Sequence, residues 1–443
     1  MSHFTGQHFA ILGAGRSGLG AARLARLHGA EVTVFDEGDP QKMAAAISKL
    51  EAENFRSVTG EAAKQMQVKA GDFQLVIVSP GIDESWPLPQ KFTQAGVPLV
   101  GETEFAFTLT QTALVAITGT NGKSTCTELI AHLFNHCGQR SLPCGNHGVS
   151  LSEVIASGEP YDVLALEVSS FQLETIRTFR AGVNIWLNFA PDHLDRYPSE
   201  AAYFSAKARL FMNCTADDIA IVRAGESVDT GVARRITFSA FGAEADYTFA
   251  DGVFFHQGQR IGDASGIRLR GRHNMENILA AIIAGHAHGL GFEEMLSAIQ
   301  SYEPPAHRCE LVRTWAGREF INDSKATNLH ALEACIASLD GPIVLIVGGK
   351  EKGLDYSDLR AGIKDHVKAM VCIGEIGPAL AAAFGDLIPC TVASSLEAAV
   401  NEAARLSQAG DSIVLSPGTS SFDMFTGYAQ RGEVYRRAVM SLS

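Results

Sequence analysis

The chain has 443 residues, of which 46% are hydrophobic and 19% are charged, a balance typical of a soluble globular protein. This length predicts two to four domains, each able to bury a core of its own. The formal net charge of −13, without any run of Lys and Arg, argues against nonspecific binding to nucleic acid, so anionic ligands would need local cationic contacts.

Targeting and membrane segments are not expected. The N-terminal sequence MSHFTGQHFAILG lacks a basic segment followed by an apolar core, which argues against a signal peptide. The apolar run over 277–292 is interrupted by glycines and histidines and predicts a packing helix, not a membrane span. None of the eight cysteines has CxxC spacing, so we expect reduced, mostly buried thiols in a cytoplasmic protein, with neither a disulfide framework nor a zinc site.

The first hundred residues contain a glycine-rich motif between a predicted strand and a predicted helix. The motif is Gly13-Ala14-Gly15-Arg16-Ser17-Gly18, and Asp36 follows 18 positions after its last glycine. This GxGxxG pattern predicts a Rossmann-type domain in which Asp36 binds a ribose hydroxyl. Because the motif is permissive, it indicates a nucleotide-like ligand more firmly than it indicates NAD. The predicted elements are strands over 9–12, 31–35, 75–78 and 99–102 and a helix over 19–29.

A second glycine-rich loop, over 118–125, lies between a short apolar strand and a helix. In such a loop, backbone N–H groups and the helix N-terminus bind phosphate, Lys123 reaches the β- and γ-phosphates, and Ser124 or Thr125 places a hydroxyl on Mg²⁺. The loop is a shortened variant, because Ile117 stands where the common pattern has glycine. The alternative is a plain glycine turn with a solvated lysine.

Two strands after this loop end in candidate metal ligands. The strand over 162–167 delivers Glu167 to the carboxyl edge of the sheet, where ligands of parallel sheets bind, so Glu167 suits Mg²⁺. The strand over 183–188 precedes His193, which lies between two acids and suits a metal ligand or general base; a hydrogen-bonded loop is the alternative. Lys207 lies on a predicted helix, and its sequence context favours a packed stem with the amine in solvent.

The remaining pattern indicates a β insertion, a linker and a further α/β unit. Short strands over 219–269 predict a small β insertion, and Asn274 and Asn277 open a helix, for which capping is the simplest explanation. The linker is Tyr302-Glu303-Pro304-Pro305, since two prolines disfavour helix. Beyond it, three predicted strands end in small, polar or charged residues, which predicts a binding face and a multi-substrate reaction with ATP in the middle. These strand ends begin at 322, 348 and 416.

Nine motifs of this chain occur in the order found in the Mur ligases of peptidoglycan synthesis, which the chain resembles over essentially its whole length. They are TGTNGKST, LEVSSFQLE, DHLDRY, YFSAKARLF, GRHNMEN, PAHRCE, INDSKATN, GGKEKG and SPGTSSFDMF. SSFQLE and NDSKATN resemble the branch of the family that adds D-glutamate to UDP-N-acetylmuramoyl-L-alanine. The DNPR-type motif of the ligase that adds a diamino acid is absent, and the related folylpolyglutamate synthetases lack an N-terminal unit with a GAGRSG loop.

The resemblance implies an α/β protein of three domains. Residues 1–103 would form a Rossmann-like domain for the UDP-substrate, 104–304 a central ATP-binding domain of the P-loop ATPase type, and 305–443 a Rossmann-like domain for the amino acid. The first domain would therefore bind UDP, in place of the dinucleotide that its motif alone suggested. The family also implies closure of the third domain by a hinge at Pro304-Pro305.

The family's functional residues carry over to matching positions of this chain. The implied reaction transfers the γ-phosphoryl group of ATP to the alanyl carboxylate and lets the amine of D-glutamate attack the acyl phosphate, with two Mg²⁺ ions and a carbamylated Lys207. The implied catalytic residues are Lys123, His193 and Lys207, and the metal ligands are Ser124, Glu167, His193 and Lys207. The implied ATP contacts are Gly119, Thr120, Asn121, Gly122, Lys123, Ser124, Thr125, Asn274, Asn277, Arg308 and Asp323. The UDP-substrate would contact Gly15, Arg16, Ser17, Asp36, Ser79, Asn146, Gln172 and His193. D-Glutamate would contact Lys325, Thr327, Lys352, Ser421 and Phe422, with Tyr428 as a weaker candidate.

The implied partners are small molecules, for a cytoplasmic monomer without nucleic-acid binding or membrane insertion. His147, Arg272 and Phe422 differ from the residues that are usual at these positions in the family. These differences affect detailed substrate contacts and leave the expected class of reaction unchanged. Two alternatives stay open: an NAD-dependent oxidoreductase with a fused ATPase, and a noncatalytic nucleotide-binding regulator that has kept the fold.

Overall fold

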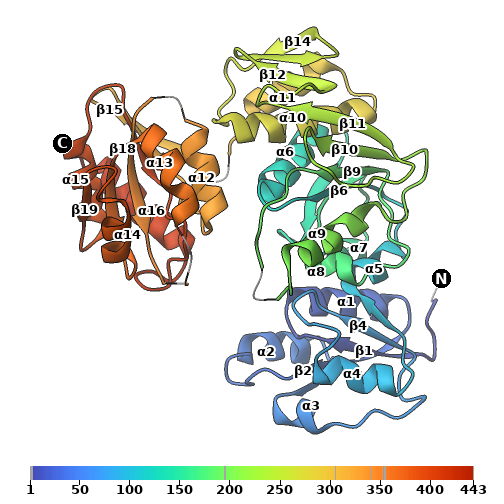
Figure 1. Cartoon of the computed structure of the whole chain (residues 1–443). Coiled ribbons are helices and arrows are strands. Elements are labelled where there is room, and N and C mark those ends of the chain that lie inside the picture. Colours follow the sequence, from blue (N-terminus) through green and yellow to red (C-terminus); the bar gives the residue numbers. More distant parts are fainter. Residues whose placement is uncertain are drawn as a thin grey trace.

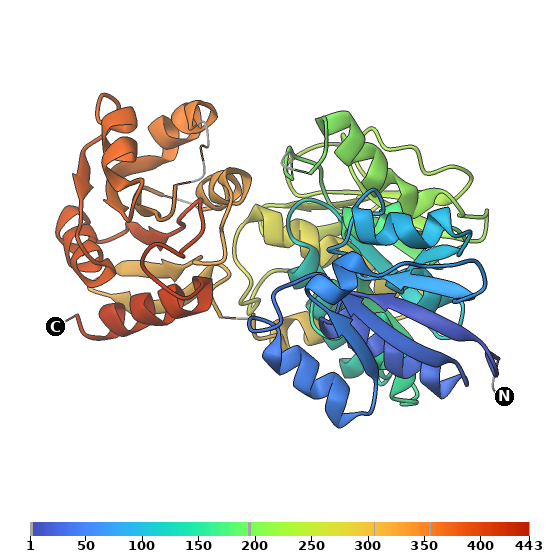
Figure 2. The ribbon, with the colours of Figure 1, turned by 90° about the horizontal axis from the view of Figure 1, so that it is seen from below.

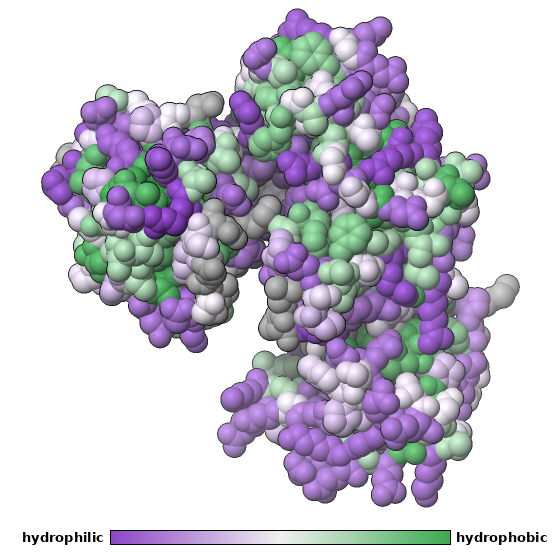
Figure 3. Space-filling view, in the orientation of Figure 1, coloured by the Kyte–Doolittle hydropathy of each residue, from purple (hydrophilic) through white to green (hydrophobic). Residues whose placement is uncertain are grey.

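A computed structural model describes residues 3–193, 196–304, 306–339, 341–351, 353 and 356–442. The chain forms three α/β units in sequence order, each built on one sheet (Figure 1). The first and third units both contact the central one, and the third unit lies to one side of the other two (Figure 2). A space-filling view shows the molecule hollowed between the third unit and the rest of the chain (Figure 3).

The first unit has the strand order that the GxGxxG motif predicts. Its sheet is parallel throughout, in the order β3-β2-β1-β4-β5. Helix α1 begins at Arg16, three residues earlier than predicted. Gly18 therefore lies in its first turn, where it packs against the carbonyl oxygen of Gly13 and leaves no room for a side chain. The strands are β1 (His8–Leu12), β2 (Glu31–Asp36), β3 (Arg56–Thr59), β4 (Leu75–Val78) and β5 (Leu99–Gly101); the helices are α1 (Arg16–Leu27), α2 (Ala44–Ala52), α3 (Glu61–Gln65), α4 (Pro87–Gln94) and α5 (Glu102–Phe107).

The central unit is built on a nine-stranded sheet in the order β14-β13-β12-β11-β10-β9-β6-β8-β7. Because β6, β8 and β9 are adjacent and parallel, the phosphate loop, Glu167 and the segment after β9 all lie at one edge. The strands are β6 (Ala113–Thr118), β7 (Ser141–Gly145), β8 (Val163–Glu167), β9 (Val183–Trp186), β10 (Ile219–Arg223), β11 (Arg234–Ser239), β12 (Tyr247–Ala250), β13 (Val253–His256) and β14 (Gln259–Asp263). The helices are α6 (Lys123–His136), α7 (Leu151–Ala156), α8 (Ser170–Glu174), α9 (Glu200–Ala208), the 3₁₀ turn η1 (Arg209–Phe211), α10 (Arg272–Ala287) and α11 (Phe292–Ser301).

The segment 219–269, predicted as a small β insertion, contains short strands, and these strands extend the central sheet. β10 pairs in parallel with β9, and β11 and β12 continue the parallel order before β13 and β14 turn back antiparallel. Alternating short strands and turns look alike in sequence whether they form a new sheet or lengthen an old one, because the pattern does not specify the pairing partner.

The third unit brings its three predicted strand ends together. Its sheet has the order β15-β16-β20-β17-β18-β19, antiparallel only between β15 and β16, so the neighbouring strands β16, β20 and β17 end at one edge. The strands are β15 (Glu310–Trp315), β16 (Arg318–Asn322), β17 (Ile343–Gly348), β18 (Val367–Ile373), β19 (Cys390–Val392) and β20 (Ser412–Leu415). The helices are α12 (Leu329–Ala337), the 3₁₀ turn η2 (Ser357–Leu359), α13 (Arg360–His366), α14 (Gly377–Phe384), α15 (Leu396–Leu406) and α16 (Tyr428–Met440).

The first and central units share an apolar core, whereas the third has its own. One continuous cluster contains Leu24 of α1, Leu151 of α7 and Leu166 of β8. The junction is reinforced by Glu104 of α5, a buried carboxylate that accepts hydrogen bonds from the backbone N–H groups of Arg177, Thr178 and Phe179 at 2.8–2.9 Å. The apolar clusters of the third unit contain no residue of the other two. The third unit is therefore the part of the molecule best able to move as a separate body.

Two predictions about chain class can be compared with the structure. None of the helices in the described ranges combines the length and apolar character needed to cross a bilayer. All eight cysteines are unpaired, and five of them are buried, as predicted.

Candidate functional site

A cavity of about 660 Å³ lies between the central and third units and collects most of the predicted nucleotide and metal residues. Residues far apart in sequence form its wall because two sheet edges, one from each unit, face each other across it. The predicted residues that line it are Thr120, Asn121, Gly122, Lys123, Ser124, Thr125, Asn146, Glu167, His193, Asn274, Asn277, Arg308, Asp323, Lys325 and Thr327.

The loop after β6 has the conformation that a phosphate loop requires. Gly119 and Gly122 have φ values of +149° and +84°, and α6 begins at Lys123. Asn188, which the sequence did not single out, fixes the loop: its Oδ1 accepts from the N–H of Asn121 at 2.9 Å and its Nδ2 donates to the carbonyl of Asn121 at 3.1 Å. The N–H groups of Thr120 and Asn121 donate to Asn188, and the N-terminus of α6 lines the cavity as the candidate anion site.

Lys123 and Lys207 meet at one carbonyl oxygen. Both amines donate to the carbonyl of Gly119, at 2.9 and 2.8 Å, and Lys123 also donates to Thr120. Lys207 is 1% exposed, so the prediction of a solvated amine was wrong: α9 turns this side chain inward, over the ring of Tyr203. Burial lowers the pKa of both lysines, and the neighbouring charge of Lys123 lowers the pKa of Lys207 further.

Glu167 offers a carboxylate oxygen that fits a cation. It is buried at the end of β8, and its Oε1 accepts from Nδ2 of Asn146 at 2.8 Å. Its Oε2 is buried and has no hydrogen-bond partner among the described residues. An unpaired buried oxygen is costly unless a proton donor or a cation occupies the space in front of it, so Glu167 suits a Mg²⁺ ligand.

His193 lies at the rim of the same cavity. Its backbone has φ = +54°, and its ring packs at centroid distances of 5.0 Å from Phe171 and 5.7 Å from Tyr203. Of the two acids, Asp192 has its Oδ2 at 3.9 Å from Nε2; the other, Asp195, is outside the described residues. The ring is thus held by aromatic contacts at the cavity.

The capping explanation for Asn274 and Asn277 is wrong. Helix α10 begins at Arg272, and both asparagines lie inside it, joined by a hydrogen bond of 3.1 Å from Nδ2 of Asn277 to Oδ1 of Asn274. Asn277 instead packs against Gly122 of the phosphate loop, where an added Cβ would lie 2.5 Å from its Oδ1. The pair therefore positions the loop and lines the cavity.

Phe241 is a second residue that sequence reasoning missed. It follows β11, is 43% exposed, and lies at the cavity wall with the Arg223 guanidinium 5.2 Å from its ring centroid. An exposed aromatic ring at a nucleotide-sized cavity is suited to stacking on a base. Its exposure is the only feature that marks it, and exposure is not visible in sequence.

Some of the predicted residues of the third unit line the large cavity, and others do not. Arg308 donates to the hydroxyl of Thr125 at 3.2 Å, and Lys325 lies 4.2 Å from the ring centroid of Tyr428. Asp323 accepts from the N–H of Cys309 and from Ser416, and burial raises its pKa to about 6. Ser421 is buried and Phe422 is 67% exposed, and neither lines the cavity. Lys352 is outside the described residues.

A second cavity, of about 240 Å³, lies between the first and central units. It is lined by Gly15, Arg16, Ser17, Ser79, Asn146 and Gln172, six of the residues predicted for the UDP-substrate. Asp36 is not among the lining residues; its carboxylate accepts from the N–H groups of Ala14 and Gly38 and so shapes the glycine-rich loop. Asn146 lines both cavities, which places them on either side of one residue.

The comparisons with known proteins cover all three units. A family profile described as the Mur ligase middle domain matches residues 117–285, the Mur ligase glutamate ligase domain matches 307–418, and the MurD-like N-terminal domain matches 7–101. The UDP-N-acetylmuramoylalanine–D-glutamate ligase of Syntrophotalea carbinolica is 39% identical, covering 100% of this chain and 99% of that protein. The enzyme of the same name from Geobacter metallireducens is 37% identical, covering 99% and 98%.

The fold is also that of a solved structure. The crystal structure of UDP-N-acetylmuramate–alanine ligase MurC from Thermotoga maritima superimposes with a TM-score of 0.60 at 16% identity, covering 98% of this chain and 99% of that one. At this identity the match supports the three-unit α/β fold alone, and it confirms the fold class predicted from the sequence.

The packing of Gly122 on Asn277 leads to a prediction about nucleotide binding. Gly122→Ala places a methyl group against Oδ1 of Asn277 and displaces the loop, so ATP binding should weaken by about 10- to 100-fold, which corresponds to ~1–3 kcal/mol of strain. Isothermal titration calorimetry with ATP measures this change in affinity. Gly138→Ala at the other end of α6 is the control, because Gly138 also has positive φ (+81°) but open space at its Cβ; equal losses in both variants would contradict the role of the contact.

Proposed function

Because this chain belongs to the Mur ligase family, we propose that it is the ATP-dependent ligase that adds D-glutamate to UDP-N-acetylmuramoyl-L-alanine in peptidoglycan synthesis. ADP and phosphate are the other products. The observation that carries this proposal is the cavity of about 660 Å³, in which the phosphate loop faces Lys325 and Thr327 of the NDSKATN segment. Full-length identity of 39% to a ligase named for this reaction supports the choice of substrates.

The first proposed step is phosphoryl transfer from ATP to the alanyl carboxylate. Both reactants are anions, so neutralisation of charge and positioning provide most of the rate enhancement. Lys123 neutralises the β- and γ-phosphates, and the loop N–H groups orient them. The proposed further ATP contacts are Gly119, Thr120, Asn121, Gly122, Ser124, Thr125, Asn274, Asn277, Arg308 and Asp323, with Phe241 at the base.

Ser124, Glu167, His193 and carbamylated Lys207 are the residues proposed to hold two Mg²⁺ ions. When bound, the ions supply positive charge between the phosphate and the carboxylate. The unpaired Oε2 of Glu167 supports this assignment, since a cation would satisfy it. His193 is proposed to bind both metal and UDP-substrate, and Asn146 holds the Glu167 carboxylate in place.

Carbamylation of Lys207 would relieve the repulsion between the two amines that share the carbonyl of Gly119. The amine in its neutral form attacks the carbon of CO₂ and releases a proton to solvent. A side chain that is positive as the ammonium thereby becomes a negative carbamate that can bind metal. Burial and the charge of Lys123 lower the pKa of Lys207, which favours the neutral, reactive amine. The product would then attract Lys123 where the ammonium form repels it.

The second proposed step is attack of the D-glutamate amine on the acyl phosphate, followed by collapse of the tetrahedral intermediate to amide and phosphate. Lys325, Thr327, Lys352, Ser421 and Phe422 are proposed to bind D-glutamate, with Tyr428 as a weaker candidate. The UDP moiety would be held by Gly15, Arg16, Ser17, Ser79 and Gln172; Asp36 acts through the loop that it shapes.

The wider setting is proposed as well. The substrates are small molecules, the protein is a cytoplasmic monomer without nucleic-acid binding or membrane insertion, and the domains are 1–103, 104–304 and 305–443. The NAD-dependent oxidoreductase is disfavoured, because the family profiles of all three units and the full-length relatives are those of Mur ligases.

Phosphate release identifies the amino acid. With ATP and UDP-N-acetylmuramoyl-L-alanine, release should require D-glutamate and should not occur with L-glutamate, L-alanine or meso-diaminopimelate, because the relatives at 37–39% identity over the full length are named for D-glutamate. A phosphate-coupled assay measures it. Release with another amino acid would keep the ligase class and change the substrate, and no release with any would favour the noncatalytic regulator.

Lys207→Ala tests the carbamate. Loss of a metal-binding carboxylate at the reacting centre should lower kcat by about 100- to 1,000-fold, and formate or acetate should restore part of the activity by filling the space that the carbamate leaves. Lys49→Ala, on the exposed face of α2, is the control and should keep full activity. A Lys207→Ala enzyme that short carboxylates do not rescue would count against the carbamate.

Closure of the third unit is proposed because Ser421 and Phe422 lie off the cavity while Lys325 and Thr327 line it. The hinge would be the linker that begins at Tyr302, since apolar contacts to the third unit's core are absent from the first two units. Small-angle scattering should show a smaller radius of gyration with a nonhydrolysable ATP analogue and the UDP-substrate. An unchanged radius under saturation would reject closure.

A further inference from the structure

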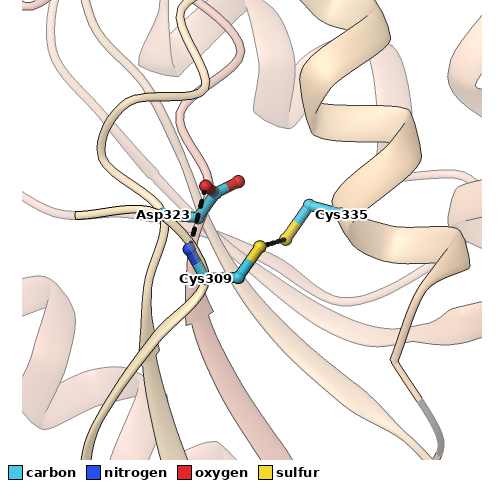
Figure 4. Close-up of side chains that lie close together, drawn as sticks. All are labelled: Cys309, Asp323 and Cys335. Atoms are coloured by element: carbon cyan, nitrogen blue, oxygen red, sulfur yellow. Dashed lines mark hydrogen bonds between the residues drawn. The ribbon is translucent and has the colours of Figure 1, made fainter. Parts of the chain in front are cut away.

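A cluster of side chains of the kind that bind metals lies at the wall of the large cavity. Of its members, only Asp323 was assigned above, as an ATP contact, and none was assigned as a Mg²⁺ ligand. Cys309 directly precedes β15, Asp323 follows β16, and Cys335 lies in α12 (Figure 4). Their ligand atoms lie within 4.8 Å of one another, and all three residues are buried. Spacings of 14 and 12 residues have no resemblance to a zinc motif, so the fold alone brings these groups together.

The two sulfurs are placed as ligands of one ion would be. Their separation is 3.9 Å, and their side chains point toward each other in Figure 4. A tetrahedral zinc with Zn–S bonds of 2.3 Å has its sulfurs about 3.8 Å apart. A disulfide bond requires about 2.0 Å, so the sulfurs are positioned as separate thiols.

A histidine lies beside them. Nε2 of His273 is 3.8 Å from Sγ of Cys309. Its other nitrogen, Nδ1, is buried without a hydrogen-bond partner in the described part of the chain. Asp323 accepts from the N–H of Cys309 at 3.2 Å with one carboxylate oxygen and from the hydroxyl of Ser416 at 3.0 Å with the other.

Simple core packing is the alternative explanation. It accounts for two buried thiols, which behave as small hydrophobic groups. It does not account for the Asp323 carboxylate that is buried beside them, next to the apolar cluster that holds Leu332 and Ile336 on either side of Cys335. Polar groups buried together at this density are characteristic of ligand shells.

The cluster is accessible to a cation. Cys309, Asp323, Cys335 and His273 all line the large cavity, so an ion can reach them from solvent without unfolding the chain. Thiolates select soft or borderline cations such as Zn²⁺ over Mg²⁺, which prefers oxygen ligands. Because a thiol binds a metal as the thiolate, cation binding must release protons and should weaken at acid pH.

We propose that Cys309, Cys335 and Asp323 form a site for a thiophilic divalent cation such as Zn²⁺ at the wall of the nucleotide cavity. The ion would use the Asp323 carboxylate that the proposed function assigns to ATP, so metal and nucleotide compete. Only this competition rests on the proposed function; the metal site itself does not.

The test uses Co²⁺ as a spectroscopic probe on the reduced full-length protein, with excess Mg²⁺ to fill oxygen-ligand sites. Titration should produce a thiolate-to-cobalt charge-transfer band and the visible bands of tetrahedral cobalt, saturating at one equivalent, and Zn²⁺ should abolish them. Cys309→Ala and Cys335→Ala should each weaken cobalt binding by more than about 100-fold, since losing a ligand costs more than losing a residue that only supports one. Cys137→Ala, at the end of α6, is the matched control and should bind as the parent does.

Circular dichroism verifies that the variants fold, and Cys335→Ser provides a second substitution if Cys335→Ala does not. Absence of the thiolate band, or its persistence in both cysteine variants, would overturn the proposal. So would the loss of two thiols on exposure to air without cobalt binding, which would mark the pair as a redox couple. A normal band with ATP affinity unaffected by zinc would keep the site and remove Asp323 from the nucleotide contacts.

Discussion

Two lysine amines hydrogen-bonded to the carbonyl of Gly119 are the constraint on which the central site depends. Like charges at this distance in a buried place are unfavourable, and Oε2 of Glu167, whose carboxylate acts on both lysines, has no hydrogen-bond partner among the described residues. A phosphate group, a cation and a negative group on Lys207 would each relieve part of this imbalance. The fold thus keeps an electrostatic arrangement that becomes favourable only when ligands are present, which is how a site binds anions tightly without collapsing on itself.

The arrangement of the three sheets explains why the ligands meet. In each parallel sheet the polar residues follow the carboxyl ends of neighbouring strands, and the units are oriented so that these edges enclose cavities. The shared apolar core and the Glu104 carboxylate keep the first two edges together. The third edge meets the central unit mainly through polar contacts such as those of Arg308 with Thr125 and Arg270 with Glu319. Such contacts form and break more easily than a packed core.

Much of this could be predicted from sequence, because strand-end position is a local property. The phosphate loop, Glu167 and the grouping of the third unit's strand ends follow from strand–loop–helix order, and the GxGxxG motif indicated a Rossmann-type sheet. Burial of Lys207 could not be predicted, because it depends on how α9 packs, and helical periodicity does not show which face is covered. Asn188 and Phe241 were missed since neither belongs to a motif. The meeting of Cys309 and Cys335 depends on a tertiary contact between the residue before β15 and α12, which sequence spacing does not encode.

Asn146 has a consequence for ligand design. Because this one residue lines both cavities, and the two units around the smaller cavity share a core, a single compound could extend past Asn146 into the part of the larger cavity that the central unit forms, and that part does not move with the third unit. Linking two weak fragments converts the second binding event into an intramolecular one and raises its effective concentration to the millimolar range or above. Such a compound would gain most from a rigid linker, since the relative position of its two halves is already fixed by the protein.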